Sequence, residues 1–122
     1  MLRLRQSRTG KYGSKRITTP DGTFDSKHEF ERFCELHILL RAGEIRKLER
    51  QVRFPLLPAK SGKFRAERPC DYIADFVYEE KRGDDWVKVV EDAKSEATKR
   101  KESYIIKRKL MLAVHNISIK EV

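Results

Sequence analysis

Two acidic residues and a lysine have types and spacing suited to metal-dependent chemistry. Asp75 interrupts the apolar run Tyr72–Val77, where a charge is costly unless something compensates it. Asp92 and Lys94 end the next β-rich run at spacing i, i+2, which places both side chains on one face of an extended strand. If the two runs pair as a hairpin, the two carboxylates approach each other and repel unless a cation or a shared proton intervenes.

Carboxylate oxygens suit Mg²⁺, with Mn²⁺ able to substitute, and such an ion also takes phosphate oxygens as ligands. The expected chemistry is therefore phosphodiester cleavage, in which Lys94 orients or deprotonates the attacking water or stabilises developing negative charge. Glu29 could complete the acidic cluster, although the capping of a helix explains it equally well. Asp71 and Glu91 stay open as alternatives, since a register shift would move the assignments to them. A purely structural ion-pair cluster is the alternative to the whole site.

The charge balance indicates a polyanionic partner. The chain has 28 Lys and Arg against 19 Asp and Glu, a formal charge of +9, which favours nucleic acid first and an acidic membrane surface second. No apolar run is long enough to span a bilayer and the N-terminus lacks the apolar core of a secretory signal, so we expect a cytoplasmic protein without membrane association. The scattered Cys and His residues predict neither a zinc site nor a nucleophile pair.

A basic helix is predicted from about Thr98 to His115, with an apolar side made of Ile106, Leu110, Ala113 and Val114. Its remaining surface is crowded with cations that we expect to contact phosphates: Lys99, Arg100, Lys101, Lys107, Arg108 and Lys109. Gln51 is a weaker candidate for nucleic-acid binding, because it opens a strand near the expected site and as an exposed residue needs no function.

The other elements place these residues on an α/β scaffold, an α+β sandwich. Pro20-Asp21-Gly22 predicts a small hairpin, and Ser26 begins a helix that ends near Gly43 and directs Glu29 inward. A strand follows at Gln51–Leu56, limited by its prolines. The runs Tyr72–Tyr78 and Trp86–Asp92 form the hairpin that carries the acids, and Ile117–Val122 forms a last strand. Residues 1–16 are expected to form a flexible basic arm and residues 17–122 the folded domain.

Taken together, these segments resemble a phage-encoded family of small PD-(D/E)XK nucleases, from about residue 10 to the C-terminus. The residues that carry the resemblance are Thr23-Phe24-Asp25-Ser26-Lys27-His28-Glu29, Gly43-Glu44-Ile45, Gln51-Val52-Arg53-Phe54-Pro55-Leu56, Tyr72-Ile73-Ala74-Asp75-Phe76 and Val89-Val90-Glu91-Asp92-Ala93-Lys94. Archaeal Holliday-junction resolvases and a transposase endonuclease subunit are relatives in that superfamily.

The resemblance implies a restriction-endonuclease-like mixed sheet flanked by helices. It also implies a catalytic set of Glu29, Asp75, Asp92 and Lys94, with the metal held by the three acids. Ala74 stands where the family motif has proline, and Asp92 begins the triplet where Glu is more frequent. Neither departure removes a ligand.

The expected function is that of a Mg²⁺-dependent, structure-selective DNA endonuclease of phage or prophage origin. It would act on Holliday junctions or other branched or nicked DNA in recombination, replication or packaging, as a homodimer by analogy with resolvases. One alternative is a DNA-binding accessory protein without turnover, for which carboxylates beside phosphate would be a disadvantage. Another is an RNA-directed nuclease, for which a platform of base-stacking aromatic residues would be expected.

Overall fold

The computed structural model describes residues 5–9 and 15–122. The chain forms two compact units, Met1–Gly43 and Glu44–Val122. The predicted basic arm, residues 1–16, lies largely outside the described residues. The parts of it that are described belong to strands, because Arg5–Thr9 forms β1 and Lys15–Arg16 begins β2.

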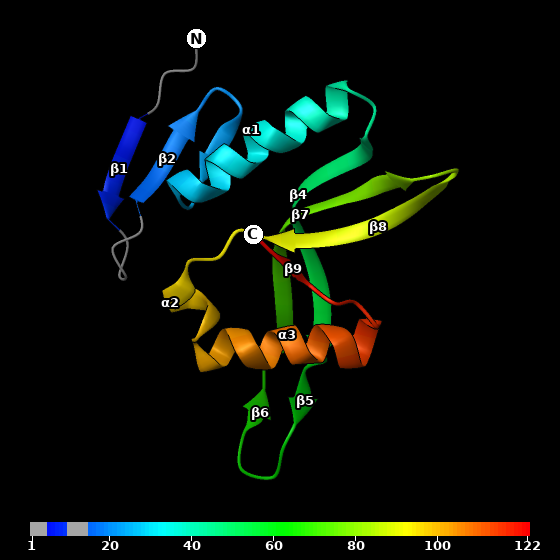
Figure 1. Ribbon diagram of the computed structural model, residues 1–122. Coiled ribbons are helices and arrows are strands. Elements are labelled where there is room, and N and C mark those ends of the chain that lie inside the picture. Colours follow the sequence, from blue (N-terminus) through cyan, green and yellow to red (C-terminus); the bar gives the residue numbers. More distant parts are fainter. Residues whose placement is uncertain (1–4, 10–14) are drawn as a thin grey trace. The chain divides into compact units, whose positions relative to one another are not determined.

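The first unit combines a three-stranded sheet with one helix (Figure 1). Strand β2 (Lys15–Thr19) pairs antiparallel with both β1 (Arg5–Thr9) and β3 (Gly22–Phe24), and helix α1 (Lys27–Arg41) follows. The predicted hairpin around Asp21 is therefore confirmed. The unit is held together by aromatic packing in which the Phe24 ring lies 5.1 Å from that of Phe30 and 4.9 Å from that of Phe33.

Helix α1 begins and ends where the sequence predicted. The Ser26 hydroxyl accepts a hydrogen bond from the Glu29 N–H at 3.1 Å, which satisfies one of the donors that a helix start leaves without a partner. Gly43 follows the C-cap residue Ala42 with φ 77°, a conformation that glycine adopts without strain.

The second unit contains a four-stranded mixed sheet of order β4-β7-β8-β9. Strands β4 (Ile45–Leu57), β7 (Cys70–Arg82) and β8 (Asp85–Asp92) are antiparallel neighbours, and β9 (Lys120–Glu121) pairs parallel with β8. The predicted mixed sheet flanked by helices is confirmed. Strand β4 runs through Pro55, which was expected to limit it, because β4 lies at the edge of the sheet, where a residue without an N–H is tolerated. The predicted last strand is shorter than expected.

The basic helix predicted from Thr98 to His115 is interrupted. Its residues lie in the short helix α2 (Glu96–Lys99) and in α3 (Glu102–His115), with Lys101 extended between them at φ −68° and ψ 131°. The break has a local cause, since the Ser95 hydroxyl accepts from the Thr98 N–H at 3.2 Å and so starts a separate turn upstream. No helix in the described part of the chain is long and apolar enough to cross a membrane.

Helix α3 packs on the sheet through a different face from the predicted one. Tyr104 and Met111 are buried and Leu110 packs against the core, whereas Ile106, Ala113 and Val114 are exposed, so the predicted apolar side is correct at Leu110 and wrong at the other three positions. The buried core of this unit consists of Phe54, Leu56, Tyr72, Ala74, Val77, Val90, Tyr104, Met111 and Ile119. The apolar residues of α3 occur all round the helix, and contact with the sheet decides which of them are buried.

Candidate functional site

Asp75 and Asp92 lie side by side, where the last residue of β8 lies next to the middle of β7. The Asp75 N–H donates to Asp92 Oδ1 at 2.9 Å, and the Ala93 N–H donates to Asp75 Oδ2 at 3.0 Å. Both residues are buried, with 6% of Asp75 and none of Asp92 exposed. The strand register explains the contact, since Phe76 pairs with Glu91 in antiparallel strands, and the two aspartates are the residue before Phe76 and the residue after Glu91. The structure thus brings together the two acids that strand spacing had predicted.

Lys94 completes the triplet that begins at Asp92. Its Nζ lies 3.8 Å from Asp92 Oδ2, and its side chain is 23% exposed. The chain end holds the backbone here, because the Val122 N–H donates to the Asp92 carbonyl at 3.0 Å and the Lys94 N–H donates to the Val122 carbonyl at 3.3 Å. The ammonium group is therefore fixed beside the carboxylate while it remains open to solvent.

The second carboxylate oxygen of Asp92 is buried without a hydrogen-bond donor. Oδ2 has no hydrogen-bond partner within the described residues, and burial raises the pKa of Asp92 to about 6, partly offset by Lys94. A buried carboxylate oxygen without a donor is costly unless a cation compensates it. Its chemistry therefore fits an oxygen ligand for a hard cation. Among the residues described, no group of three or more His, Cys, Asp or Glu could hold a metal ion. The acids that the structure brings together in this unit are Asp75 and Asp92.

Gln51 also reaches this cluster. It lies opposite Asp75 in the ladder of β4 and β7, and its Nε2 is 3.4 Å from Asp75 Oδ1. Its backbone is left-handed, with φ 52°, which is uncommon for a residue other than glycine and costs roughly 1 kcal/mol or more. The sequence had placed Gln51 near the site but contained no signal for this backbone conformation.

Glu29 belongs to the first unit and is buried there, with 2% of it exposed. Its Oε2 accepts a hydrogen bond from the Asp25 N–H at 3.0 Å, close to the helix start. The predicted inward orientation is present, and the Ser26 hydroxyl caps the helix at the Glu29 backbone N–H, whereas the Glu29 carboxylate accepts from the residue before the cap. Its membership of the acidic cluster stays a prediction.

The two alternative acids have other partners. Glu91 Oε1 accepts from the Tyr78 hydroxyl at 2.8 Å and lies 3.9 Å from Lys120 Nζ. Asp71 lies 3.5 Å from Arg53. The register that unites Asp75 with the Asp92 triplet is therefore the one the structure adopts.

A basic hollow of about 320 Å³ opens next to Lys94. Its lining residues are Asp71, Tyr72, Ile73, Lys94, Thr98, Lys101, Ser103, Tyr104 and Lys107. Three of the lining side chains are lysines, and the Tyr104 ring lies 5.7 Å from Lys94 Nζ. The Tyr104 hydroxyl donates to Glu121 at 2.6 Å, and burial with that carboxylate raises the pKa of Tyr104. Tyr104 thus contributes a neutral phenol to the wall of the hollow.

The predicted phosphate-binding cations differ in their surroundings. Lys99 lies 3.3 Å from Glu96, and Arg108 lies 3.9 Å from Glu121, so carboxylates partly neutralise both. Lys101 and Lys107 line the hollow, and Arg100 and Lys109 are exposed. The sequence identified the cations but could not distinguish those that face the site.

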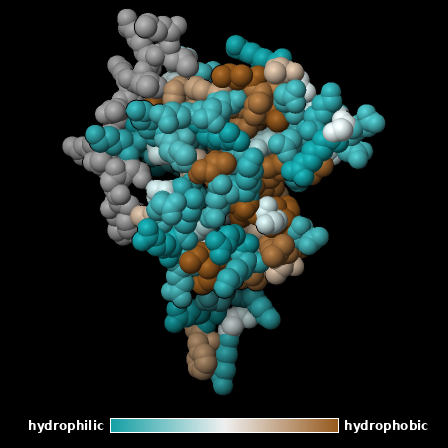
Figure 2. Space-filling view, in the orientation of Figure 1, coloured by the Kyte–Doolittle hydropathy of each residue, from teal (hydrophilic) through white to brown (hydrophobic). Residues whose placement is uncertain are grey.

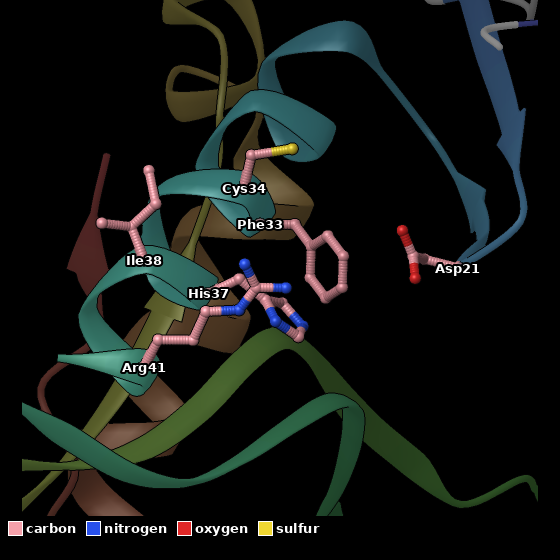
Figure 3. A pocket seen from close by; sticks show the side chains of 6 residues that line it. All are labelled: Asp21, Phe33, Cys34, His37, Ile38 and Arg41. Atoms are coloured by element: carbon pink, nitrogen blue, oxygen red, sulfur yellow. The ribbon is translucent and has the colours of Figure 1, made fainter. Parts of the chain in front are cut away.

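A second hollow, of about 260 Å³, lies in the first unit (Figure 3). Phe33 and His37 contact each other edge to face in it, with their ring centroids 4.4 Å apart, and Cys34 and Asp21 contribute to its lining. Burial is the main cause that raises the pKa of the Cys34 thiol, with nearby acids adding to it, so the thiol stays protonated near neutral pH and is a weak nucleophile. This hollow lacks the paired acids of the other unit.

Comparison with known proteins assigns the family. The family described as "Protein of unknown function (DUF1064)" matches residues 9–120. The chain belongs to this family. No curated protein and no solved structure gives a significant match. The match to DUF1064 spans both units and includes every candidate site residue.

Proposed function

We propose that this DUF1064 chain is a metal-dependent endonuclease that hydrolyses phosphodiester bonds in branched or nicked DNA. The observation that carries the proposal is the buried Asp75–Asp92 pair, in which Asp92 Oδ2 has no donor within the described residues and Lys94 stands 3.8 Å away. Lys94 forms an ion pair with that oxygen at 3.8 Å, beyond hydrogen-bond distance, whereas a purely structural ion pair would be expected to include a direct hydrogen bond. The proposal places the enzyme in the cytoplasm of a bacterial host, acting on phage recombination, replication or packaging intermediates.

Asp75 and Asp92 are the residues that would hold Mg²⁺ or Mn²⁺. When bound, the ion supplies charge neutralisation at the phosphate and lowers the pKa of water. Asp75 is held for this task by backbone N–H and side-chain amide donors, from Ala93 and Gln51. Asp92 contributes the oxygen that lacks a donor.

Lys94 supplies the positive charge of the site. Its ammonium group is anchored at Asp92 and open to solvent, so it can donate a hydrogen bond to a phosphate oxygen or orient a water for attack. A fixed cation stabilises the extra negative charge that develops on phosphorus oxygens during hydrolysis.

The hollow beside Lys94 provides a binding surface for the DNA backbone. Lys101 and Lys107 line it together with Lys94, and the chain as a whole carries a formal charge of +9. Phosphate contacts of this kind give affinity without reading sequence, and each contributes to the salt dependence of binding. This surface suits recognition of DNA by its backbone and shape.

The test is cleavage of labelled four-way junction, nicked duplex and linear duplex DNA in Mg²⁺ or in EDTA. We expect Mg²⁺-dependent cutting of the branched or nicked substrates. Asp75→Asn should abolish it, and Asp85→Asn, the same change at the exposed start of β8, should not. Tight DNA binding with no cutting under any divalent metal would contradict the proposal. It would support a DNA-binding accessory protein instead.

A further inference from the structure

A small hairpin extends from the sheet of the second unit. Strands β5 (Lys60–Ser61) and β6 (Ala66–Glu67) pair antiparallel between the ends of β4 and β7, and the hairpin projects past α3 (Figure 1). Every residue from 57 to 69 is exposed. The hairpin thus contributes little to the core, so its residues are available to bind a partner.

The apex of this hairpin is a tight two-residue turn. Ser61 pairs with Ala66, and the Gly62 N–H donates to the Arg65 carbonyl at 2.9 Å, which leaves Lys63 and Phe64 at the apex. A side chain at position 62 would not fit, since its Cβ would lie 2.7 Å from the Arg65 carbonyl oxygen. The turn therefore presents the two apex residues in a defined conformation.

Phe64 is 90% exposed at the apex. Its ring has a cation beside it, with Lys63 Nζ 5.5 Å from the ring centroid. Figure 2 shows a hydrophobic group at the end of the hairpin next to hydrophilic ones. Polar residues and glycine are usual at the apex of a turn, whereas a large aromatic ring there stays exposed to solvent and gains nothing from burial in the core.

The charges around Phe64 identify the partner. Residues 58–69 contain four cations and one acid, namely Lys60, Lys63, Arg65 and Arg68 against Glu67. Cations that flank an exposed aromatic ring match a nucleic acid, because they contact phosphates while the ring stacks on a base.

The hairpin is also connected to the candidate site. Strand β7 leads from β6 to Asp75, eleven residues beyond Phe64. At about 3.3 Å per residue, the apex lies at most roughly 36 Å from the aspartate pair. A duplex extends 3.4 Å per base pair, so the apex can reach DNA within about ten base pairs of the cleaved bond.

We infer that Phe64 is a wedge that stacks on an unpaired or unstacked base at a branch or nick while the flanking cations hold the phosphates. The inference rests on the proposed function and extends it, because it assigns the preference for branched or nicked DNA to this hairpin. Insertion between bases requires unstacking, which costs least where pairing is already interrupted.

Tryptophan fluorescence provides the test. The chain has a single tryptophan, Trp86, so Phe64→Trp combined with Trp86→Phe leaves one indole, at the apex. With DNA in EDTA, and with binding followed independently by anisotropy of labelled DNA, we expect emission to fall at least about twofold on nicked or four-way DNA and much less on intact duplex. Wild type, with Trp86 alone, is the control and should change little.

Phe64→Ala should lower affinity for nicked or four-way DNA about tenfold and affinity for intact duplex less than twofold. Unchanged apex emission on bound DNA would overturn the inference while leaving the endonuclease proposal in place if Mg²⁺-dependent cutting is present. If the emission of the apex tryptophan shifts to the blue with phosphatidylserine vesicles and does not change with DNA, the hairpin binds membranes instead. Absence of any DNA binding would overturn both proposals.

Discussion

Consecutive residues at the end of β8 bury their carboxyl groups in different ways. Glu91 and Asp92 both have 0% exposure. Glu91 accepts from the Tyr78 hydroxyl and has Lys120 nearby, whereas one oxygen of Asp92 has no donor within the described residues. Neighbouring strand positions face opposite sides of the sheet, so the two acids meet different environments.

The difference separates a structural acid from a candidate functional one. Burying a carboxylate with its hydrogen bonds satisfied is compatible with a stable fold, whereas burying one with an oxygen lacking a donor lowers stability. Functional sites commonly retain such destabilising buried groups, because a bound ligand or substrate supplies the missing interaction. The comparison predicts that substitutions at the two positions differ in their effect on cleavage, and that changes to the two buried carboxylate environments have opposite effects on stability.

The largest expected difference is in cleavage. Asp92→Asn should lower the cleavage rate by about 10³-fold or more, because it replaces the charged group that we propose as a metal ligand with a neutral amide. Glu91→Gln, the same chemical change one residue earlier, should lower it less than about tenfold. Single-turnover cleavage of a nicked duplex in Mg²⁺ measures both, with circular dichroism to show that each variant is folded. Equal losses at the two positions would contradict the division of roles.

The second difference is in stability and its pH dependence. The folded-state pKa of Asp92, about 6, lies above the ordinary value of 3.8, so the charged carboxylate destabilises the fold. The loss of folding free energy caused by the charged Asp92 carboxylate is absent below about pH 4. It grows as pH rises through 6 and reaches at most about 3 kcal/mol. Asp92→Asn in EDTA should therefore stabilise the protein at pH 8 and give no gain near pH 4.

Tyr78→Phe tests the Glu91 carboxylate for comparison with Asp92→Asn. It removes a donor from a buried carboxylate and should destabilise the protein by roughly 1–2 kcal/mol at pH 8. Urea unfolding of both variants at pH 4 and pH 8 measures the two effects. A loss of stability in Asp92→Asn at pH 8 would show that Asp92 is a structural acid like its neighbour.

Much of the aspartate pair was predictable from the sequence because strand geometry is simple. Side chains alternate between the two faces, so the spacing of Asp92 and Lys94 and the polar interruption at Asp75 indicated which residues would meet. The capped start of α1 at Ser26 is a local signal of the same kind. These features depend on neighbours in sequence or on one hairpin, and the structure confirms them.

Other features depend on contacts that no local pattern encodes. The buried face of α3 is set by Tyr104 packing on the sheet, and the apolar residues around that helix allowed a wrong choice. The position of Lys94 depends on its backbone pairing with Val122 at the far end of the chain. Phe64 was passed over because an isolated aromatic near a Ser-Gly turn has no periodicity, and only the strand register places it at the apex.

The smallest expected difference concerns two strained positions in β4. Gln51 and Lys47 both have left-handed backbones, with φ of 52° and 55°, but only Gln51 contacts an aspartate of the pair. Glycine adopts this conformation without strain, so Gln51→Gly and Lys47→Gly should each raise stability by about 0.5–1 kcal/mol. Lys47→Gly loses an exposed ion pair with Glu79, a small offset.

Cleavage distinguishes the two glycine variants. Gln51→Gly removes the amide that helps hold Asp75 and should lower the cleavage rate by several-fold, whereas Lys47→Gly should leave it unchanged. Thermal unfolding and single-turnover cleavage measure the pair of effects. A gain in stability at both positions with no loss of cleavage at either would make Gln51 a strained residue without a part in the site. A loss at Gln51 alone would mean that the strain is retained because the amide positions Asp75.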